Sequence, residues 1–392
     1  MKTNDVDIIN LGCRLNIYEG EVIKSLAHKN NLSNFTIINS CAVTQEAEKK
    51  VKYEIRKSKK NFPEKKIIVT GCAAQINPQK YANIDEVDFV IGNKEKLQKQ
   101  IWSSLPNSNP VQVKDIFANN TIHNNIVEKF EGKSRAYIEV QQGCDHRCTF
   151  CVIPFGRGNN RSVPLGVIVE RIKTLVNNGY NEVVLTGVDI TDYGRDLPGQ
   201  PNLFQLVKRI LNLIPDLKQL RLSSIDCAEI TDDFWPLLQE KRLMPHFHLS
   251  LQAGNDLILK RMKRRHTCQQ VFDFCQKARS IRNDIVFGAD IIAGFPTETE
   301  DMFQDSLNMI RDCNLTHLHI FPYSVRENTP AARMPQVPKN IIKQRAKLLR
   351  EAGERQMNKY LSTQIGISAI MLVEQTKENI SFGKSQHFTK IE

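Results

Sequence analysis

The sequence predicts an α/β protein made of an N-terminal doubly wound parallel sheet, a central open (β/α)6 partial barrel and a short C-terminal β segment. Short apolar runs alternate with segments of helical spacing along the first hundred residues, and six further strand-and-helix repeats follow from residue 135. Such alternation is typical of parallel sheets covered by helices. A chain of 392 residues is also too long for one ordinary core. The predicted parts are 1–105, a linker at 106–134, 135–361 and 362–392.

Composition and charge narrow the class of protein. Hydrophobic residues make up 41% of the chain and charged residues 25%, which is typical of folded globular proteins, and the net charge of +11 favours a polyanionic partner. The first residues, Met1–Asp7, carry charge where a signal peptide needs an apolar run. No stretch approaches the roughly 18 apolar residues of a membrane helix. We therefore expect a cytoplasmic protein without a membrane partner, in which clustered cysteines bind metal or do chemistry.

A cysteine follows each of the first three predicted strands. The apolar runs and their cysteines are Val6–Leu11 with Cys13, Phe35–Asn39 with Cys41, and Lys66–Thr70 with Cys72. Because the carboxyl ends of parallel strands meet at one edge of a sheet, the fold is expected to bring these three thiols together. They would then suit a three-thiolate metal cluster. Three buried core cysteines are the alternative, since cysteine also packs as a small apolar residue.

The remaining elements follow from apolar patterns. Further elements of the first part are helices at 17–28, 45–61 and 94–104 and a strand at 87–91, and the Asn-rich linker contains one short strand near Val111. The barrel strands are expected at 136–140, 182–185, 219–222, 246–251, 286–292 and 317–321, with helices at 164–178, 202–214, 232–241, 267–282, 298–312 and 339–361. Six repeats are fewer than a closed barrel needs, so we expect an open barrel with its site at the carboxyl-terminal rim.

The loop after the first barrel strand holds three more cysteines. Cys144, Cys148 and Cys151 have the spacing C-x₃-C-x₂-C, and no fourth cysteine or histidine follows at a spacing that completes a usual zinc site. Three thiolates without a fourth protein ligand fit a [4Fe–4S] cluster that keeps one iron open. An incomplete zinc site or a chance group of thiols is the alternative.

Polar and basic segments follow the other barrel strands. The segments at this rim are Thr186–Ile190, Ser223–Asp226, Gln252–Asn255, Gly288–Asp290 and Gly294–Glu298. A basic run before the fourth barrel helix contains Lys260, Arg261, Lys263, Arg264 and Arg265. Lysine and arginine at this density suit phosphate contacts. Beside a candidate site the run indicates either nucleic-acid binding or a solvated loop.

These motifs together resemble the radical S-adenosylmethionine (SAM) methylthiotransferases. The cysteine loop, with Phe150 before its last cysteine, resembles the radical SAM signature. Gly12–Glu19, Asn39–Thr44 and Thr70–Cys72 resemble the N-terminal motifs of the family. The resemblance runs from about Val6 to about Pro338 and implies two [4Fe–4S] clusters, one at each group of three cysteines.

The resemblance also implies a cofactor site. It places SAM at the open iron of the cluster in the cysteine loop, and it implies contacts to SAM from Phe150, Gly187, Asp189, Ser223, Ser224, Gln252 and Asp290. In the mechanism that the resemblance implies, one SAM supplies a methyl group to sulfur at the N-terminal cluster. A second SAM would then yield the radical that removes hydrogen from the substrate carbon, and this carbon would take up the methylthio group.

Among the branches of the family, the chain most resembles the one that methylthiolates N6-threonylcarbamoyladenosine at position 37 of tRNA. The segments that carry this are Gly12–Glu19, Val140–Gly143, Pro154–Gly158 and Leu185–Asp189. The implied partners are tRNA, a reductant such as a flavodoxin or ferredoxin, and an unassigned sulfur donor. The alternatives are the isopentenyladenosine branch, the branch acting on a ribosomal-protein aspartate, and an impaired iron–sulfur RNA-binding protein. The last arises because the tail resembles a TRAM domain and is expected to be incomplete.

Overall fold

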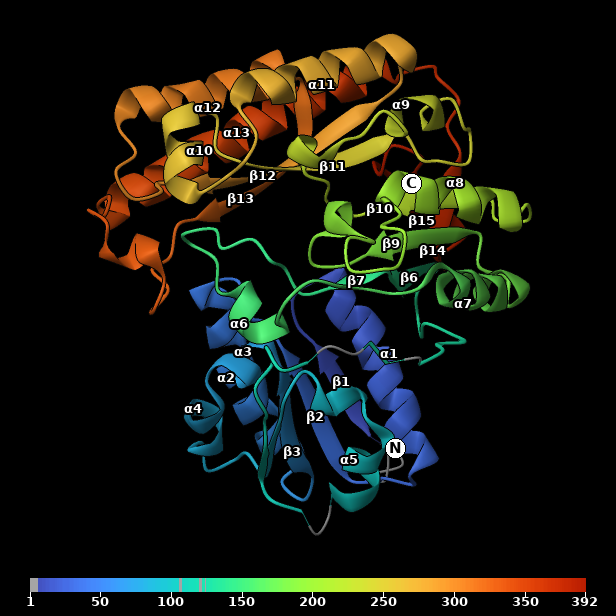
Figure 1. Cartoon of the computed structure of the whole chain (residues 1–392), viewed down its shortest axis with the longest axis vertical. Coiled ribbons are helices and arrows are strands. Elements are labelled where there is room, and N and C mark those ends of the chain that lie inside the picture. Colours follow the sequence, from blue (N-terminus) through green and yellow to red (C-terminus); the bar gives the residue numbers. More distant parts are fainter. Residues whose placement is uncertain (1–5, 106–107, 120–121, 124) are drawn as a thin grey trace.

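The computed structural model of the chain has an N-terminal sheet with helices, a half-open barrel and a small C-terminal sheet (Figure 1). It describes residues 6–392 except 106–107, 120–121 and 124. Most of the charged N-terminus noted above, residues 1–5, lies outside the described residues. In the described part of the chain, every helix is too short or too polar to cross a membrane.

The N-terminal sheet has five parallel strands in sequence order. They are β1 (Asp7–Asn10), β2 (Phe35–Ser40), β3 (Lys66–Gly71), β4 (Phe89–Ile91) and β5 (Val111–Gln112). The predicted parallel sheet is confirmed, but the strand order lacks the reversal usual in doubly wound sheets. The short strand near Val111 pairs with β4, so part of the predicted linker extends this sheet.

Helices cover both faces of this sheet. The helical elements are α1 (Arg14–Lys29), α2 (Gln45–Asn61), α3 (Cys72–Ile76), α4 (Pro78–Ala82), η1 (Glu95–Leu97) and α5 (Lys99–Ser104). Side chains alternate across a strand, so adjacent residues of β2 serve different layers. Ile37 packs with α1 and α5 in one core, whereas Ile38 packs with α2 and α3 in the other.

The barrel has six parallel strands in two sheets. One sheet has the order β10-β9-β6 and the other β11-β12-β13. The strands are β6 (Arg135–Glu139), β9 (Glu182–Thr186), β10 (Gln219–Leu222), β11 (His246–Gln252), β12 (Val286–Ala293) and β13 (Leu315–Pro322), and β7 (Gln141–Gln142) pairs with β8 (Arg161–Ser162) beside them. Ile225 joins the two sheets, because its N–H donates to His248 O at 2.8 Å and its carbonyl accepts from Ser250 at 2.9 Å. The predicted open barrel is confirmed.

The six predicted barrel helices lie close to their predicted positions. The structure adds helical elements that were not predicted, which are α6 (Ile153–Arg157), η3 (Ile190–Asp192), η4 (Cys227–Glu229), α10 (Asp256–Met262) and η5 (Pro330–Arg333). The predicted helices are α7 (Leu165–Asn177), α8 (Leu203–Leu213), α9 (Phe234–Leu237), α11 (Cys268–Ile281), α12 (Glu300–Asp312) and α13 (Lys339–Thr363). Only α9 is much shorter than the predicted 232–241. Its last predicted residues leave the helix because Arg242 O and Met244 N hydrogen-bond to Leu220 of β10.

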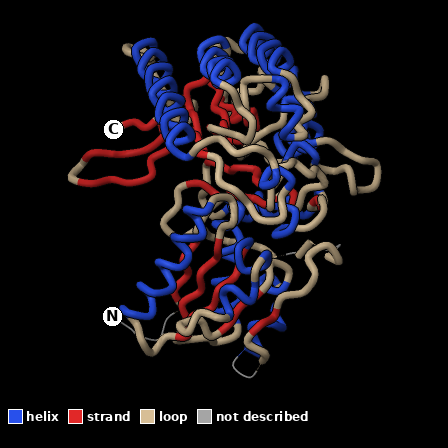
Figure 2. Tube along the Cα trace, turned by 90° about the vertical axis from the view of Figure 1, so that its left-hand side faces the viewer, coloured by secondary structure: helices blue, strands red, loops and turns tan. Residues whose placement is uncertain are grey.

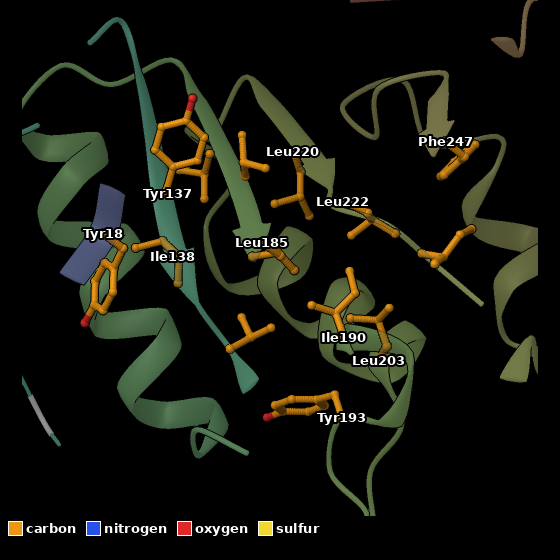
Figure 3. Packing of buried hydrophobic residues seen from close by; sticks show 14 of the residues in the cluster. Tyr18, Tyr137, Ile138, Leu185, Ile190, Tyr193, Leu203, Leu220, Leu222 and Phe247 are labelled. Carbon is orange, nitrogen blue, oxygen red and sulfur yellow. The ribbon is translucent and has the colours of Figure 1, made fainter. Parts of the chain in front are cut away.

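The N-terminal part packs directly on the barrel. Helix α1 runs from the N-terminal sheet to β6 (Figure 1). Figure 3 shows its Tyr18 beside Ile138 of β6, and both residues belong to one continuous core. The Tyr18 hydroxyl donates to Asn125 O at 3.0 Å. This shared core holds the ends of the N-terminal strands against the barrel.

The C-terminal sheet is antiparallel, with β14 (Met371–Lys377), β15 (Ile380–Ser385) and β16 (Lys390–Ile391). Figure 2 shows β14 and β15 as a projecting hairpin. Its first strand starts later than the predicted Ile365, because Gly366 has a φ of +80° and Ile367 N closes a turn on Gln364 O. Phe388 folds back onto the barrel, where its ring stacks on His246 at 5.4 Å.

The histidines at this end of the barrel predict a pH-dependent stability. Burial lowers the pKa of His317 to about 4 and that of His246 well below its usual value. Unfolded histidine titrates near 6.5, so the unfolded state binds more protons below that pH and the free energy of unfolding falls as pH drops from about 6.5 to 4. We expect the thermal midpoint to fall between pH 7 and 5, and to fall less in His317→Asn. If the thermal midpoint fell equally with pH in His317→Asn and in the exposed control His28→Asn, the pH dependence would not come from His317.

Candidate active site

The three N-terminal cysteines lie at the carboxyl edge of the sheet. Cys13 follows β1 and caps α1, Cys41 follows β2, and Cys72 opens α3 directly after β3. Gly12 has a φ of +98°, and a Cβ there would come within 2.8 Å of Cys41 Sγ. A glycine is therefore required for the Cys13 loop to pass so close to Cys41.

The charges of these thiols influence one another. Burial, together with negative charge on Cys72 and Cys13, raises the pKa of Cys41 to about 12. Three thiolates whose charges repel one another need a strong positive partner, which a metal cluster provides. The donor set therefore fits a cluster at the place that the strand pattern predicted.

The second group occupies the loop after β6 and β7. Two hydrogen bonds join this cysteine loop to the segment that follows it. Cys144 N donates to Gly158 O at 3.1 Å, and Ile153 N donates to Cys151 Sγ at 3.4 Å. Burial raises the pKa of Cys151 to about 12 and that of Cys144 further. Here too, three thiols in one place suit an iron–sulfur cluster, which holds them as thiolates.

His146, inside the loop, lies beside two carboxylates. Its Nε2 lies 3.1 Å from Asp189 Oδ2 and 3.4 Å from Glu229 Oε1. Hydrogen bonding to these two carboxylates raises the pKa of His146 to about 10, so the carboxylates favour its protonated form. The ligand atoms of Cys144, His146 and Asp189 lie within 4.8 Å of one another, so this part of the loop could also hold a metal ion.

The two cysteine groups meet at the interface. A Cβ at Gly156 of α6 would lie 3.1 Å from Cys72 Cβ, and Arg157 Nε donates to Cys72 Sγ at 3.1 Å. Asn93 Nδ2 donates to Gly156 O at 2.5 Å and lies 3.8 Å from Cys72 Sγ. Charge on Cys72 also raises the pKa of Cys151. The helix that continues the cysteine loop is thus packed on a cysteine of the other group.

The residues predicted to contact SAM lie on several strands around the loop. Phe150 packs edge-on against Phe295 at 6.3 Å, and Asp189 Oδ2 lies 3.9 Å from Cys144 Sγ. Gly187 lies close to Gln141, whose Oε1 accepts from Asp189 N at 2.8 Å. Ser223, Ser224 and Gln252 are half-buried at or just beyond the ends of β10 and β11.

Asp290 lies deeper in the barrel than the other predicted residues. Its Oδ1 is 2.9 Å from His248 Nε2 and 3.1 Å from His319 Nδ1. It sits three residues before the end of β12, which is about 10 Å at the rise of a strand. Its measured neighbours are histidines, and contact with SAM stays a prediction.

The basic run divides into two groups. Arg264 is turned inward, where it donates to Asp226 Oδ2 at 2.7 Å and lies 3.7 Å from Cys148 Sγ. Arg261 donates to Thr297 Oγ1 at 2.8 Å. Lys260, Lys263 and Arg265 are exposed, although Arg265 also pairs with Glu229 at 2.6 Å. Arg264 therefore belongs to the cysteine site and does not face solvent.

Sequence patterns did not identify the charged network that joins the two parts. Arg157 donates to Asn16 Oδ1 at 2.5 Å and pairs with Glu19, which also binds Lys96 Nζ at 2.7 Å. All four side chains are buried. Burial alone would raise the pKa of Glu19, but Arg157 and Lys96 lower it to about 2. Arg157 and Glu19 lie in segments that resemble the family motifs, and this resemblance was the sequence signal that could have identified them.

Comparisons with known proteins agree with this geometry. Residues 138–310 match the family model of the radical SAM superfamily, and residues 5–92 match that of the uncharacterized protein family UPF0004. The structure of the radical S-adenosylmethionine methyltransferase TsrM from Kitasatospora setae, with cobalamin and a [4Fe–4S] cluster bound, has a TM-score of 0.59. It is 13% identical and covers 85% of this chain and 77% of that chain, so it supports the fold alone.

Two curated relatives extend over most of the chain. The threonylcarbamoyladenosine tRNA methylthiotransferase MtaB of Rickettsia prowazekii is 54% identical over 369 residues, which cover 94% of this chain and 87% of the relative. The protein of the same name from Aquifex aeolicus is 36% identical, with 89% of this chain and 88% of the relative covered. With both groups of three cysteines in place, this chain belongs to the radical SAM methylthiotransferases.

Proposed function

We propose that this protein adds a methylthio group to carbon 2 of N6-threonylcarbamoyladenosine at position 37 of tRNA. The observation that carries the proposal is the meeting of two three-cysteine groups at one interface, through Arg157 and Cys72. A relative named for this reaction is 54% identical over nearly the whole chain, which supports the choice of substrate.

The residues present fit the cofactors of the family, which are SAM and two [4Fe–4S] clusters. When bound at Cys144, Cys148 and Cys151, the cluster and SAM would provide the radical chemistry that removes hydrogen from the substrate. The cluster at the N-terminal cysteines would carry the methylthio group. The chain itself fixes the positions of the two cysteine groups relative to each other. Arg264 donates toward Cys148 and Arg157 toward Cys72, and both donors stabilise thiolate charge.

Partners follow from the charge and the chemistry. Lys260, Lys263 and Arg265 are exposed beside the cysteine loop, where they are suited to contact RNA phosphates. A low-potential electron carrier such as a flavodoxin or ferredoxin supplies the reductant, and the sulfur donor is unassigned. We place this chemistry in the cytoplasm, where tRNA is modified.

Nucleoside analysis tests the substrate. In cells that lack their own threonylcarbamoyladenosine methylthiotransferase, expression of this chain is expected to restore 2-methylthio-N6-threonylcarbamoyladenosine, detected by mass spectrometry of digested tRNA. A Cys148→Ala variant is the matched negative control. If the 2-methylthio group appears instead on isopentenyladenosine or on a ribosomal-protein aspartate, the proposed substrate is wrong.

A further inference from the structure

A cavity opens where α2 and α3 meet the barrel loop that follows β13. It has a volume of about 320 Å³. Three of its lining residues come directly after cysteines of the two groups, and these are Ala42 after Cys41, Ala73 after Cys72 and Val152 after Cys151. Because consecutive Cα atoms are about 3.8 Å apart, the cavity begins next to both cysteine groups.

One wall of the cavity is a face of α2 that continues beyond it. The residues of α2 that line the cavity are Gln45, Glu48, Lys49 and Lys52. Residues three and four apart share one face of a helix, so Arg56 and Lys60 extend the same face. Val51 and Ile55 bury the opposite face in the core. The exposed cations Lys49, Lys52, Arg56 and Lys60, here called the α2 row, therefore lead away from the cavity over about 16 Å.

The charges along this face are predominantly positive. In the part of the chain that the structure describes, Lys52, Arg56 and Lys60 form no ion pair, and Lys49 lies 3.9 Å from Glu46 in a loose exposed pair. Two carboxylates line the cavity, those of Glu48 and Glu327. Glu48 is already paired with Arg326 at 2.7 Å and with Lys80 at 2.6 Å. The α2 row is thus left to attract an anionic ligand.

Contacts with the barrel fix the place of α2 relative to the cysteines. Arg326, in the loop after β13, is 8% exposed, and it donates to Ala42 O beside Cys41 as well as pairing with Glu48 of α2. Gln45 Nε2, in the first turn of α2, donates to Val325 O of the same loop at 3.2 Å. The α2 row therefore has a defined position beside both cysteine groups.

We propose that the cavity and the α2 row bind the sugar–phosphate backbone of the tRNA next to the modified nucleotide. The inference rests on the proposed function, which supplies the RNA, and it names a surface that holds it. A nucleotide that reacts at both cysteine groups has its neighbouring phosphates close by, and a row of exposed lysines and arginines suits them. Tyr53 is 60% exposed beside the row and offers an aromatic ring on which a base can stack.

The salt dependence of RNA binding tests the inference. We would measure binding of an anticodon stem-loop that carries N6-threonylcarbamoyladenosine to the cluster-loaded protein, using fluorescence anisotropy over a range of salt concentrations. Lys52→Gln/Arg56→Gln is expected to bind about tenfold more weakly at low salt. The slope of log K against log salt should become shallower by about one for each cation removed. Lys208→Gln/Arg209→Gln, which removes two exposed cations from α8, should match the wild type in both.

Further variants and outcomes make the test decisive. Lys52→Arg/Arg56→Lys keeps both charges and should keep the slope, and an unchanged iron content verifies that the α2 variants still hold their clusters. Wild-type affinity and slope in Lys52→Gln/Arg56→Gln would overturn the inference. If that variant also lost methylthiolation in cells, the row would serve a protein partner such as the electron carrier. If the wild type binds RNA with this salt dependence yet forms no 2-methylthio nucleoside, the proposed function fails while the RNA surface stands.

Discussion

Replacing Cys72 with alanine is expected to abolish methylthiolation while SAM cleavage continues. Cys72 belongs to the N-terminal group, whereas SAM is assigned to the cysteine loop, so the two activities separate. Iron per chain should fall from about eight to about four, since each [4Fe–4S] cluster needs its thiolates. The measurements are iron content after anaerobic reconstitution, 5′-deoxyadenosine released, and 2-methylthio nucleoside formed.

Cys275→Ala provides the matched control. Cys275 is buried in the barrel core, 1% exposed, and belongs to neither group. It should keep full iron content and both activities, with only the modest stability loss of a small core deletion. If Cys72→Ala lost SAM cleavage together with methylthiolation while Cys275→Ala did not, the division of labour between the groups would be wrong.

The positions of the six cysteines could be predicted because each depends on a local pattern. Cys13, Cys41 and Cys72 each follow a short apolar run, and parallel strands bring such positions to one edge whatever their order. That is why these three cysteines follow the strand ends at one edge of the sheet, although the strand order has no reversal. The barrel strands could be predicted equally well, since apolar runs and helical periods mark each repeat.

The contacts between the parts could not be predicted. Arg157 and Glu19 are 138 residues apart, and nothing in either segment names the other as its partner. Arg264 shows the same limit, because a basic run identifies charge but not the direction in which each side chain points.

The Arg157 network leads to the second large expected effect. Arg157→Ala should destabilise the protein by about 3–5 kcal/mol, because it leaves Glu19 buried with Lys96 as its remaining cation. The same change removes the hydrogen bond to Cys72 Sγ. Hydrogen bonds to cluster sulfurs raise the reduction potential, so the potential of the N-terminal cluster should fall. Urea unfolding and an EPR-monitored redox titration measure the two effects.

Two further variants separate the charge of Arg157 from its shape. Arg157→Lys keeps the ion pair with Glu19 but loses the fork that reaches Asn16 and Cys72 together, so it should recover part of the stability and less of the potential. Arg195→Ala is the exposed control, since its pair with Asp192 at 3.6 Å leaves the arginine 64% exposed and is worth at most about 1 kcal/mol. Equal urea midpoints for Arg157→Ala and Arg195→Ala would show that the network does not hold the parts together. If only the reduction potential of the cluster at Cys144, Cys148 and Cys151 changed, the hydrogen bond from Arg157 would not act on the N-terminal cluster and the prediction would be wrong. The expected pattern, a stability loss together with a shift confined to the N-terminal cluster, is one that a purely structural role of Arg157 cannot produce.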